Sequence, residues 1–201
     1  MANVPVIIRE TAHGAYSLTL ADKLFAQREV LLEGGIDRAK AMDTINQLRI
    51  LAEEGNTPIT LLINSPGGDV VSGFAIYDTM HAIPCDVRTI CIGEASSMAA
   101  IILAGGTKGC RAMLPNSEVM IHDPILTGCG GPALTVEAIS QRLMRTRRQA
   151  AQALADCTGR TVDEILEKTA KDCFFSAEEA VEFGLVDSIL TSFGGDERDA
   201  G

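Results

Sequence analysis

The sequence predicts an α/β fold, because short apolar segments alternate with segments of helical periodicity along the chain. Residues 59–63 are followed by a helical pattern over 70–82, and residues 87–92 by a run of small and apolar residues over 98–103. Residues 59–63 form a continuous apolar strand, which is typical of a sheet covered on both faces.

Length and composition predict one globular domain over residues 1–201. The chain is 46% hydrophobic and 22% charged, as in an ordinary globular protein with a real core. Its formal net charge of −10 argues against a nucleic-acid-binding protein, which usually carries a basic patch.

Several absences predict a cytoplasmic protein that binds no membrane. No apolar run approaches the roughly 18 residues that span a bilayer. The N-terminus lacks the basic and apolar regions of a signal peptide. The six cysteines form no Cys-x-x-Cys pair, so we expect reduced thiols rather than a zinc site or a disulfide framework.

The N-terminal part predicts a hairpin or mobile loop followed by helices and strands. Residues 6–10 and 15–19 are expected as strands around a tight loop. A short helix over 21–27 and a short strand over 29–32 follow. Asp37 then caps a helix that runs to about Glu54.

The middle of the chain predicts two strand–helix pairs joined by glycine-containing turns. The strand over 59–63 leads through Ser65-Pro66-Gly67-Gly68 to the helix over 70–82. The strand over 87–92 leads to the helix over 98–103. Two further strands are expected at 110–114 and 118–122.

The C-terminal part predicts one long helix and two short ones. A glycine-rich segment at 126–132 precedes a helix over 133–157, which we expect to pack against another subunit. Capping boxes at 161–164 and 176–179 begin two helices. Gly184 ends the second, residues 185–190 are expected as a last strand, and residues 194–201 as a flexible tail.

Ser96 and Ser97 lie where the strand over 87–92 passes into the next helix. A serine at such a turn is well placed as a nucleophile, because the helix N-terminus offers unpaired N–H groups to a developing oxyanion. Serine is also a favoured N-cap residue. On this segment alone, the helix cap is the better interpretation.

A general base is sought among three histidines. His13 lies in the N-terminal loop and His81 ends a helix, whereas His122 follows an apolar strand and precedes Asp123-Pro124. A histidine held at a strand end can reach out of the sheet edge and serve the serine as general base. A hydrogen-bonded framework histidine is the alternative for any single histidine.

The orienting carboxylate is not selected by spacing, because the chain has 27 acidic residues. Asp172 lies between two predicted helices beside apolar neighbours, a position that suits a partly buried carboxylate. Asp123 is the alternative, but it adjoins His122, and neighbours in an extended segment point to opposite sides.

The turn at 65–68 is a candidate for backbone contact with a ligand. Two glycines after a buried strand allow N–H groups to approach a ligand closely. An ordinary strand-to-helix turn is the alternative. A phosphate loop is disfavoured, because the glycine–lysine spacing of such loops is missing.

Four motifs together resemble ClpP, the family of proteolytic subunits of Clp proteases. They occur in the family's order and at its spacing, and the resemblance runs from about residue 4 to about residue 190. The motifs are Ile-Asn-Ser-Pro-Gly-Gly at 63–68, Gly-Glu-Ala-Ser-Ser-Met at 93–98, and the segments 114–122 and 176–187.

The resemblance implies the ClpP/crotonase-type fold, with spiralling β-β-α units and a protruding handle helix. It implies Ser97 as nucleophile, His122 as general base and Asp172 as third triad member, with no metal. The backbone N–H groups of Gly68 and Met98 would form the oxyanion hole. An edge strand over residues 125–131 would pair with an extended substrate. Its substrate-binding residues would be Ile125, Leu126, Thr127, Gly128 and Cys129.

The same resemblance implies a serine endopeptidase that hydrolyses unfolded polypeptides inside two stacked seven-membered rings. An AAA+ unfoldase such as ClpX, ClpA or ClpC would feed it. That partner would use ATP, and this chain would need no cofactor. Residues 1–19 match the axial pore loop, and residues 125–157 match the handle strand and helix.

Several positions depart from the family. Glu94 stands where the family usually has glutamine. Thr60, Leu62 and Ala82 stand where aromatic residues often line the pocket that docks the unfoldase. Ala-Lys at 170–171 replaces an acidic residue and arginine that link the rings. These changes suggest a divergent paralogue that forms mixed rings with a second ClpP.

Two other functions are alternatives to a peptidase. A catalytically weak or regulatory ring subunit of a mixed ClpP complex would explain the altered ring and docking positions. A crotonase-type acyl-CoA enzyme would share the fold and an oxyanion hole, but it would not use a triad of Ser97, His122 and Asp172.

Overall fold

A computed structural model describes residues 6–11, 14–126 and 128–193 and confirms the α/β fold class. His13, Thr127 and the expected tail at 194–201 lie outside the described residues. The strands are β1 (Val6–Thr11), β2 (Gly14–Thr19), β3 (Glu29–Glu33), β4 (Ile59–Ser65), β5 (Val87–Ser96), β6 (Arg111–Met113), β7 (Glu118–Ile121), β8 (Cys173–Phe175) and β9 (Ser188–Ile189). The helices are α1 (Leu20–Ala26), α2 (Arg38–Glu54), α3 (Val70–Ala82), α4 (Met98–Ala104), α5 (Ala133–Thr158), α6 (Val162–Lys168) and α7 (Ala177–Phe183).

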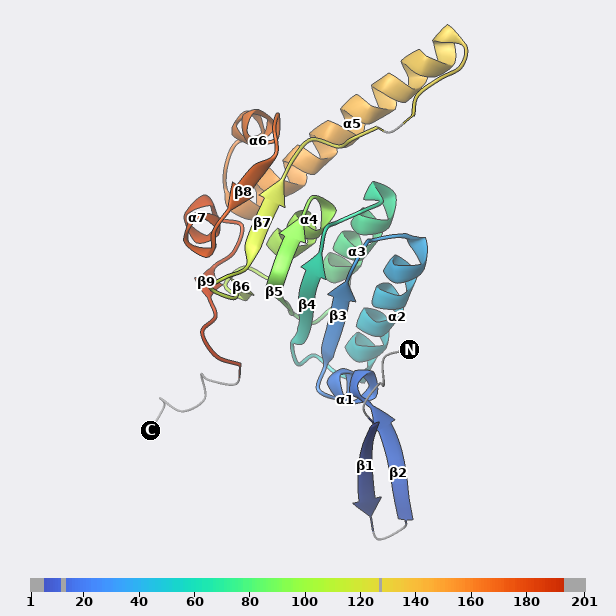
Figure 1. Cartoon of the computed structure of the whole chain (residues 1–201), viewed down its shortest axis with the longest axis vertical. Helices are drawn as coiled ribbons and strands as arrows, with labels where there is room; N and C mark the ends of the chain where they lie inside the picture. The colour runs from blue at the N-terminus through green and yellow to red at the C-terminus, as the bar shows by residue number, and fades with distance from the viewer. Residues whose placement is uncertain (1–5, 12–13, 127, 194–201) are drawn as a thin grey trace.

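The main sheet branches at β5. Its strand order is β3-β4-β5-β6-β9, while β7 pairs with the last residues of β5 and β8 pairs with β7. Every pair is parallel except β7–β8. Figure 1 shows α2, α3 and α4 on one face of the sheet, with α5 extending beyond the body and the β1–β2 hairpin projecting at the opposite end.

The helices cover one face of the sheet and leave the other partly open. In β4, Leu61 and Ile63 are fully buried, whereas Thr60 and Leu62 are half-buried. Leu31, which pairs with Leu62, is 38% exposed. The expectation of a strand covered on both faces is therefore wrong for the single chain, because within the described residues the face of β4 that carries Thr60 and Leu62 stays partly exposed.

Two strand predictions need correction. The strand β8 was not expected, because three residues are too few to show a period. The strand expected over 185–190 is reduced to the two residues of β9. The N–H groups of Leu185 and Val186 bond instead to the carbonyl of Ala180, as part of the turn that ends α7 at Gly184.

Other sequence expectations are confirmed. Capping boxes begin α6 at Thr161 and α7 at Ser176. All six cysteines are free. Among the described residues, no helix combines the length and the apolar character needed to cross a membrane.

A buried ion pair attaches the segment between α7 and β9 to β6. Arg111 Nη2 lies 2.6 Å from Asp187 Oδ1, and the Arg111 side chain is 4% exposed. Gly109 donates its N–H to Asp187 Oδ2 at 2.8 Å. Burial acts to raise the pKa of Asp187, but the hydrogen bonds from Arg111 and Gly109 and the nearby charge outweigh it and lower that pKa.

We expect Asp187→Asn to lower the free energy of unfolding by about 3 kcal/mol at pH 7, because it leaves a buried guanidinium without its carboxylate. The folded-state pKa of Asp187 is depressed, so its contribution is present above the ordinary value of 3.8 and is lost as the pH falls through the folded value. Thermal unfolding should show a difference in Tm from wild type that narrows in acid. Asp78→Asn, which removes an exposed carboxylate, is the control, and a difference that does not change with pH would contradict this account.

Candidate active site

The register of β5 and β7 brings Ser97 beside the end of β7. The two strands run parallel and pair Ser96 with Met120. One step further, the N–H of Ser97 donates to the carbonyl of Met120 at 2.8 Å. The backbone of Ser97 is therefore fixed to Met120, which precedes His122 by two residues.

The antiparallel pairing of β7 and β8 places Asp172 opposite His122. The last pair of this ladder is Ile121 with Cys173. His122 and Asp172 follow in the same register, and directly opposite residues of an antiparallel pair have their side chains on one face. The short strand β8 thus places Asp172 opposite His122, a position that could not be inferred from sequence spacing.

Ser97 has a backbone conformation that serine rarely adopts. Its φ is 56° and its ψ is −121°, a region that costs non-glycine residues about 1–3 kcal/mol. The side chain makes no capping bond to α4. Instead, Oγ of Ser97 lies 2.8 Å from Nε2 of His122. Ser97 therefore occupies the N-cap position of α4, but its side chain does not cap the helix.

The other ring nitrogen of His122 faces Asp172 at a longer distance. Nδ1 lies 3.5 Å from Asp172 Oδ1, and the Asp172 side chain is 64% exposed, against 14% for His122. A hydrogen bond of ordinary strength is shorter than this. The expectation of a partly buried carboxylate is wrong in the single chain, because Ala170 and Lys171 just before it are also exposed.

Asp123, the alternative carboxylate, is engaged elsewhere. Its two oxygens accept hydrogen bonds from Nε of Arg147 at 2.6 Å and from Oγ1 of Thr169 at 2.8 Å. The geometry therefore favours Asp172 as the partner of the His122 ring.

The turn at 65–68 passes directly beside Ser97. A Cβ on Gly67, whose φ is +85°, would lie 2.9 Å from Ser97 Cβ and 3.0 Å from the backbone nitrogen of Met98. Only glycine permits this approach. Gly68 is held next to Ile36 by a β-bridge. Within the described part of the chain, the N–H groups of Gly68 and Met98 have no acceptor, so both can donate to a ligand.

A bulge in β5 shapes the approach to this turn. The register between β4 and β5 shifts just before Ser65. The N–H of Glu94 donates to Asn64 Oδ1 at 3.3 Å, and the N–H of Gly93 donates to Ser117 Oγ at 2.9 Å. Sequence reasoning missed Asn64 and Ser117 as residues that hold the bulge, although both lie within the motifs that carried the resemblance.

A groove of about 770 Å³ begins at Gly68 and runs between α3 and α5. Ile125 is 71% exposed and Leu126 is 44% exposed, and the described residues of the expected substrate strand form no ladder. The segment is thus an unpaired edge beside the groove. Apolar side chains dominate the lining, among them Val71, Phe74, Ile125, Leu126, Ile139 and Leu143.

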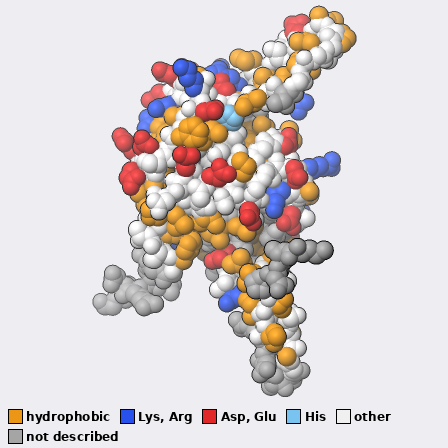
Figure 2. Space-filling model, viewed as in Figure 1, with side chains coloured by type: hydrophobic (Ala, Val, Ile, Leu, Met, Phe, Trp, Pro, Cys, Tyr) orange, Lys and Arg blue, Asp and Glu red, His pale blue; other side chains and the backbone are white. Residues whose placement is uncertain are grey.

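Glu94 lies on the open face of the sheet. It pairs in register with Glu118, and both are exposed. Ser96 donates its hydroxyl to Glu94 Oε2 at 3.5 Å. Figure 2 shows acidic and apolar side chains interspersed on this face. The carboxylate of Glu94 is therefore solvated and bonded to Ser96, the serine that does not contact His122.

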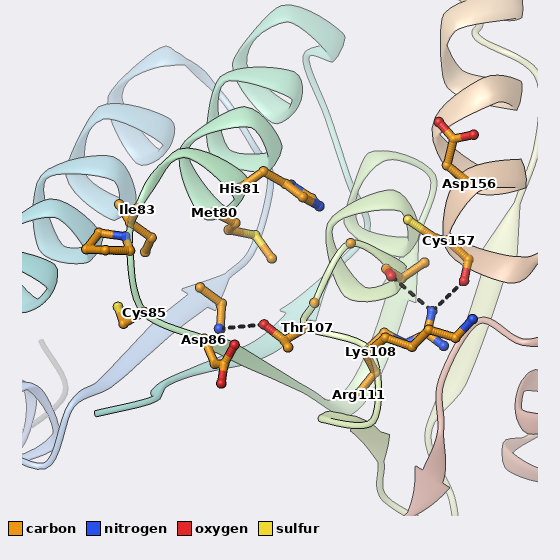
Figure 3. Close-up of a pocket in the computed structure, with 15 residues that line it drawn as sticks. Met80, His81, Ile83, Cys85, Asp86, Thr107, Lys108, Arg111, Asp156 and Cys157 are labelled. Atoms are coloured by element: carbon orange, nitrogen blue, oxygen red, sulfur yellow. Dashed lines mark hydrogen bonds between the residues drawn. The ribbon is translucent and has the colours of Figure 1, made fainter. Parts of the chain in front are cut away.

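A second pocket, of about 410 Å³, is lined by residues of α3, the loop after α4 and the end of α5 (Figure 3). His81 lines it, but its Nδ1 is bonded to the Tyr77 carbonyl at 2.8 Å. Arg111 donates to the Cys157 carbonyl at 3.0 Å. Burial raises the pKa of the Cys157 thiol, which disfavours the nucleophilic thiolate. Cys157 is therefore not an activated nucleophile in this pocket.

A serine hydroxyl bonded to a strand-end imidazole is characteristic of serine hydrolases. The chain belongs to the Clp protease family, because the sequence model of that family matches residues 12–193. It is 44% identical over 188 residues to the ATP-dependent Clp protease proteolytic subunit 1 of Thermobifida fusca (strain YX), covering 93% of this chain and 85% of that protein. The protein is therefore a peptidase.

We expect Ser97→Gly to be more stable than Ser97→Ala by about 1 kcal/mol, because glycine adopts a positive φ without strain. Neither variant has a hydroxyl, so the comparison isolates the backbone. Thermal unfolding of the two variants measures the difference. Greater stability of Ser97→Ala would show that the turn at Ser97 is not strained.

Proposed function

We propose that the protein is a serine endopeptidase in which Ser97 is the nucleophile, His122 the general base and Asp172 the orienting carboxylate. The observation that carries this proposal is the 2.8 Å contact between Ser97 Oγ and His122 Nε2. The nearby backbone N–H groups of Gly68 and Met98 would form the oxyanion hole.

The arrangement supports acyl transfer in two steps. Ser97 Oγ attacks the scissile carbonyl carbon as His122 Nε2 accepts its proton, and the carbonyl electron pair moves onto oxygen. The N–H groups of Gly68 and Met98 stabilise that oxyanion. Its collapse expels the amine, which takes the proton from His122. Water then hydrolyses the ester on Ser97 by the same route and releases the acid.

The substrate would bind as an extended strand along residues 125–129. The described residues of this segment form no ladder, so their backbone can pair with any peptide, and affinity would come from main-chain hydrogen bonds and depend little on sequence. The apolar groove beside Ile125 and Leu126 would receive a substrate side chain.

We further propose that the chain assembles into two stacked seven-membered rings that an AAA+ unfoldase feeds. The related protein from Thermobifida fusca is named a proteolytic subunit of an ATP-dependent protease. The partly open apolar sheet face at Leu31 and Leu62 supports contact with another chain. Residues 1–19 would form the axial loop, residues 125–157 the handle, and the unfoldase would use the ATP.

A catalytically weak subunit of a mixed ring is the second candidate. The observation that favours it is the exposure of Asp172, whose 3.5 Å contact with His122 is too long to orient the ring firmly. In this case a second ClpP chain in the ring would be needed for full activity.

Hydrolysis of a fluorogenic peptide, measured beside the native mass, tests these proposals together. We expect Ser97→Ala to lower kcat by at least about 10⁴-fold, because the nucleophile is removed. Ser96→Ala is the matched control and should keep near-wild-type kcat, since Ser96 bonds to Glu94.

A wild-type protein that hydrolyses no peptide, alone or mixed with a second ClpP, would contradict the peptidase proposal. A fully active assembly of fourteen identical chains would remove the case for mixed rings. A peptidase of lower mass would contradict the double-ring assembly.

A further inference from the structure

We propose that Asp123, Arg147 and Thr169 form a clamp that positions His122 for catalysis. The three residues, called here the Asp123 clamp, lie outside the triad and act through it. The proposal rests on the proposed function of Ser97, His122 and Asp172.

The clamp uses both oxygens and the backbone of Asp123. Oδ2 accepts from Nε of Arg147 at 2.6 Å, and Oδ1 accepts from Oγ1 of Thr169 at 2.8 Å. The N–H of Asp123 donates to the Thr169 carbonyl at 2.8 Å. Thr169 is 4% exposed, so its hydroxyl has little access to water as a replacement partner.

These bonds join the two backbone segments that carry His122 and Asp172. Asp123 directly follows His122, and Thr169 precedes Asp172 by three residues. The β7–β8 ladder ends before either triad residue, and the contact between them measures 3.5 Å. The clamp therefore supplies hydrogen bonds just beyond the ladder, where the imidazole must be held to within a fraction of an ångström.

The clamp also connects this segment to α5 and α6. Arg147 lies on α5, and its Nη2 donates to the Leu166 carbonyl of α6 at 3.2 Å. Between Ser97, His122 and the α5 residues Ala150 and Leu154 there remains a cavity of only about 10 Å³. Because α5 packs this closely behind Ser97 and His122, a shift of Arg147 would also displace the imidazole of His122.

Steady-state kinetics of Thr169→Val and Arg147→Met test the clamp, with rates divided by the concentration of folded, assembled protein. We expect kcat to fall by about 10- to 100-fold with KM within about 2-fold, because the imidazole is misplaced while the substrate groove is intact. The double variant should lose little more than either single one, since the residues act as a unit.

Two variants serve as controls. Thr169→Ser keeps the hydroxyl and, unlike Thr169→Val, should retain near-wild-type kcat, which a purely steric role of Thr169 would not predict. Arg148→Met removes the same charge from the next, exposed position of α5 and should leave kcat unchanged. Thr169→Val conserves side-chain volume, so it tests the clamp even if Arg147→Met fails to fold.

The outcomes separate the clamp from the proposed function. If wild type is active and both Thr169→Val and Arg147→Met keep its kcat per assembled subunit, the clamp is refuted, even where Tm falls. If wild type hydrolyses nothing, the proposed function is refuted, and the clamp proposal, which rests on it, is refuted as well.

Discussion

The position of β7 between β5 and β8 determines the rest of the site. Its parallel ladder with β5 fixes Ser97 through the bond to the Met120 carbonyl, and its antiparallel ladder with β8 sets Asp172 opposite His122. Because side chains alternate along a strand, a slip of one residue in either ladder would turn His122 to the other face. The geometry of the candidate site is thus a property of backbone pairing between segments far apart in the sequence.

Two features of the single chain are matched by the proposed assembly. Leu31 on the open face of β3 is exposed and Leu62 of β4 is half-buried, and Asp172 stands in an exposed loop at a long distance from His122. A neighbouring subunit would cover the open sheet face and reduce the exposure of Asp172. The bonds among Asp123, Arg147 and Thr169 hold His122 from within the chain, so they complement such contacts.

Local chemistry made much of the fold predictable, whereas non-local pairing did not. The capping boxes at Thr161 and Ser176 and the glycine turn at 65–68 act within a few residues, and the structure has helix starts and a turn at these positions. The three-residue strand β8 has no period to detect and exists through its ladder with β7. For that reason spacing left Asp172 among many carboxylates, and its apolar neighbours and the family resemblance were needed to select it.

Mapping a fluorophosphonate adduct by mass spectrometry on the assembled protein tests the central claim most directly. The reagent reacts with a serine that is activated by a general base and has an oxyanion hole. The account predicts a single adduct on Ser97 that is lost in His122→Ala. An adduct on Ser96 or elsewhere, or labelling of Ser97 that survives the loss of His122, would contradict it.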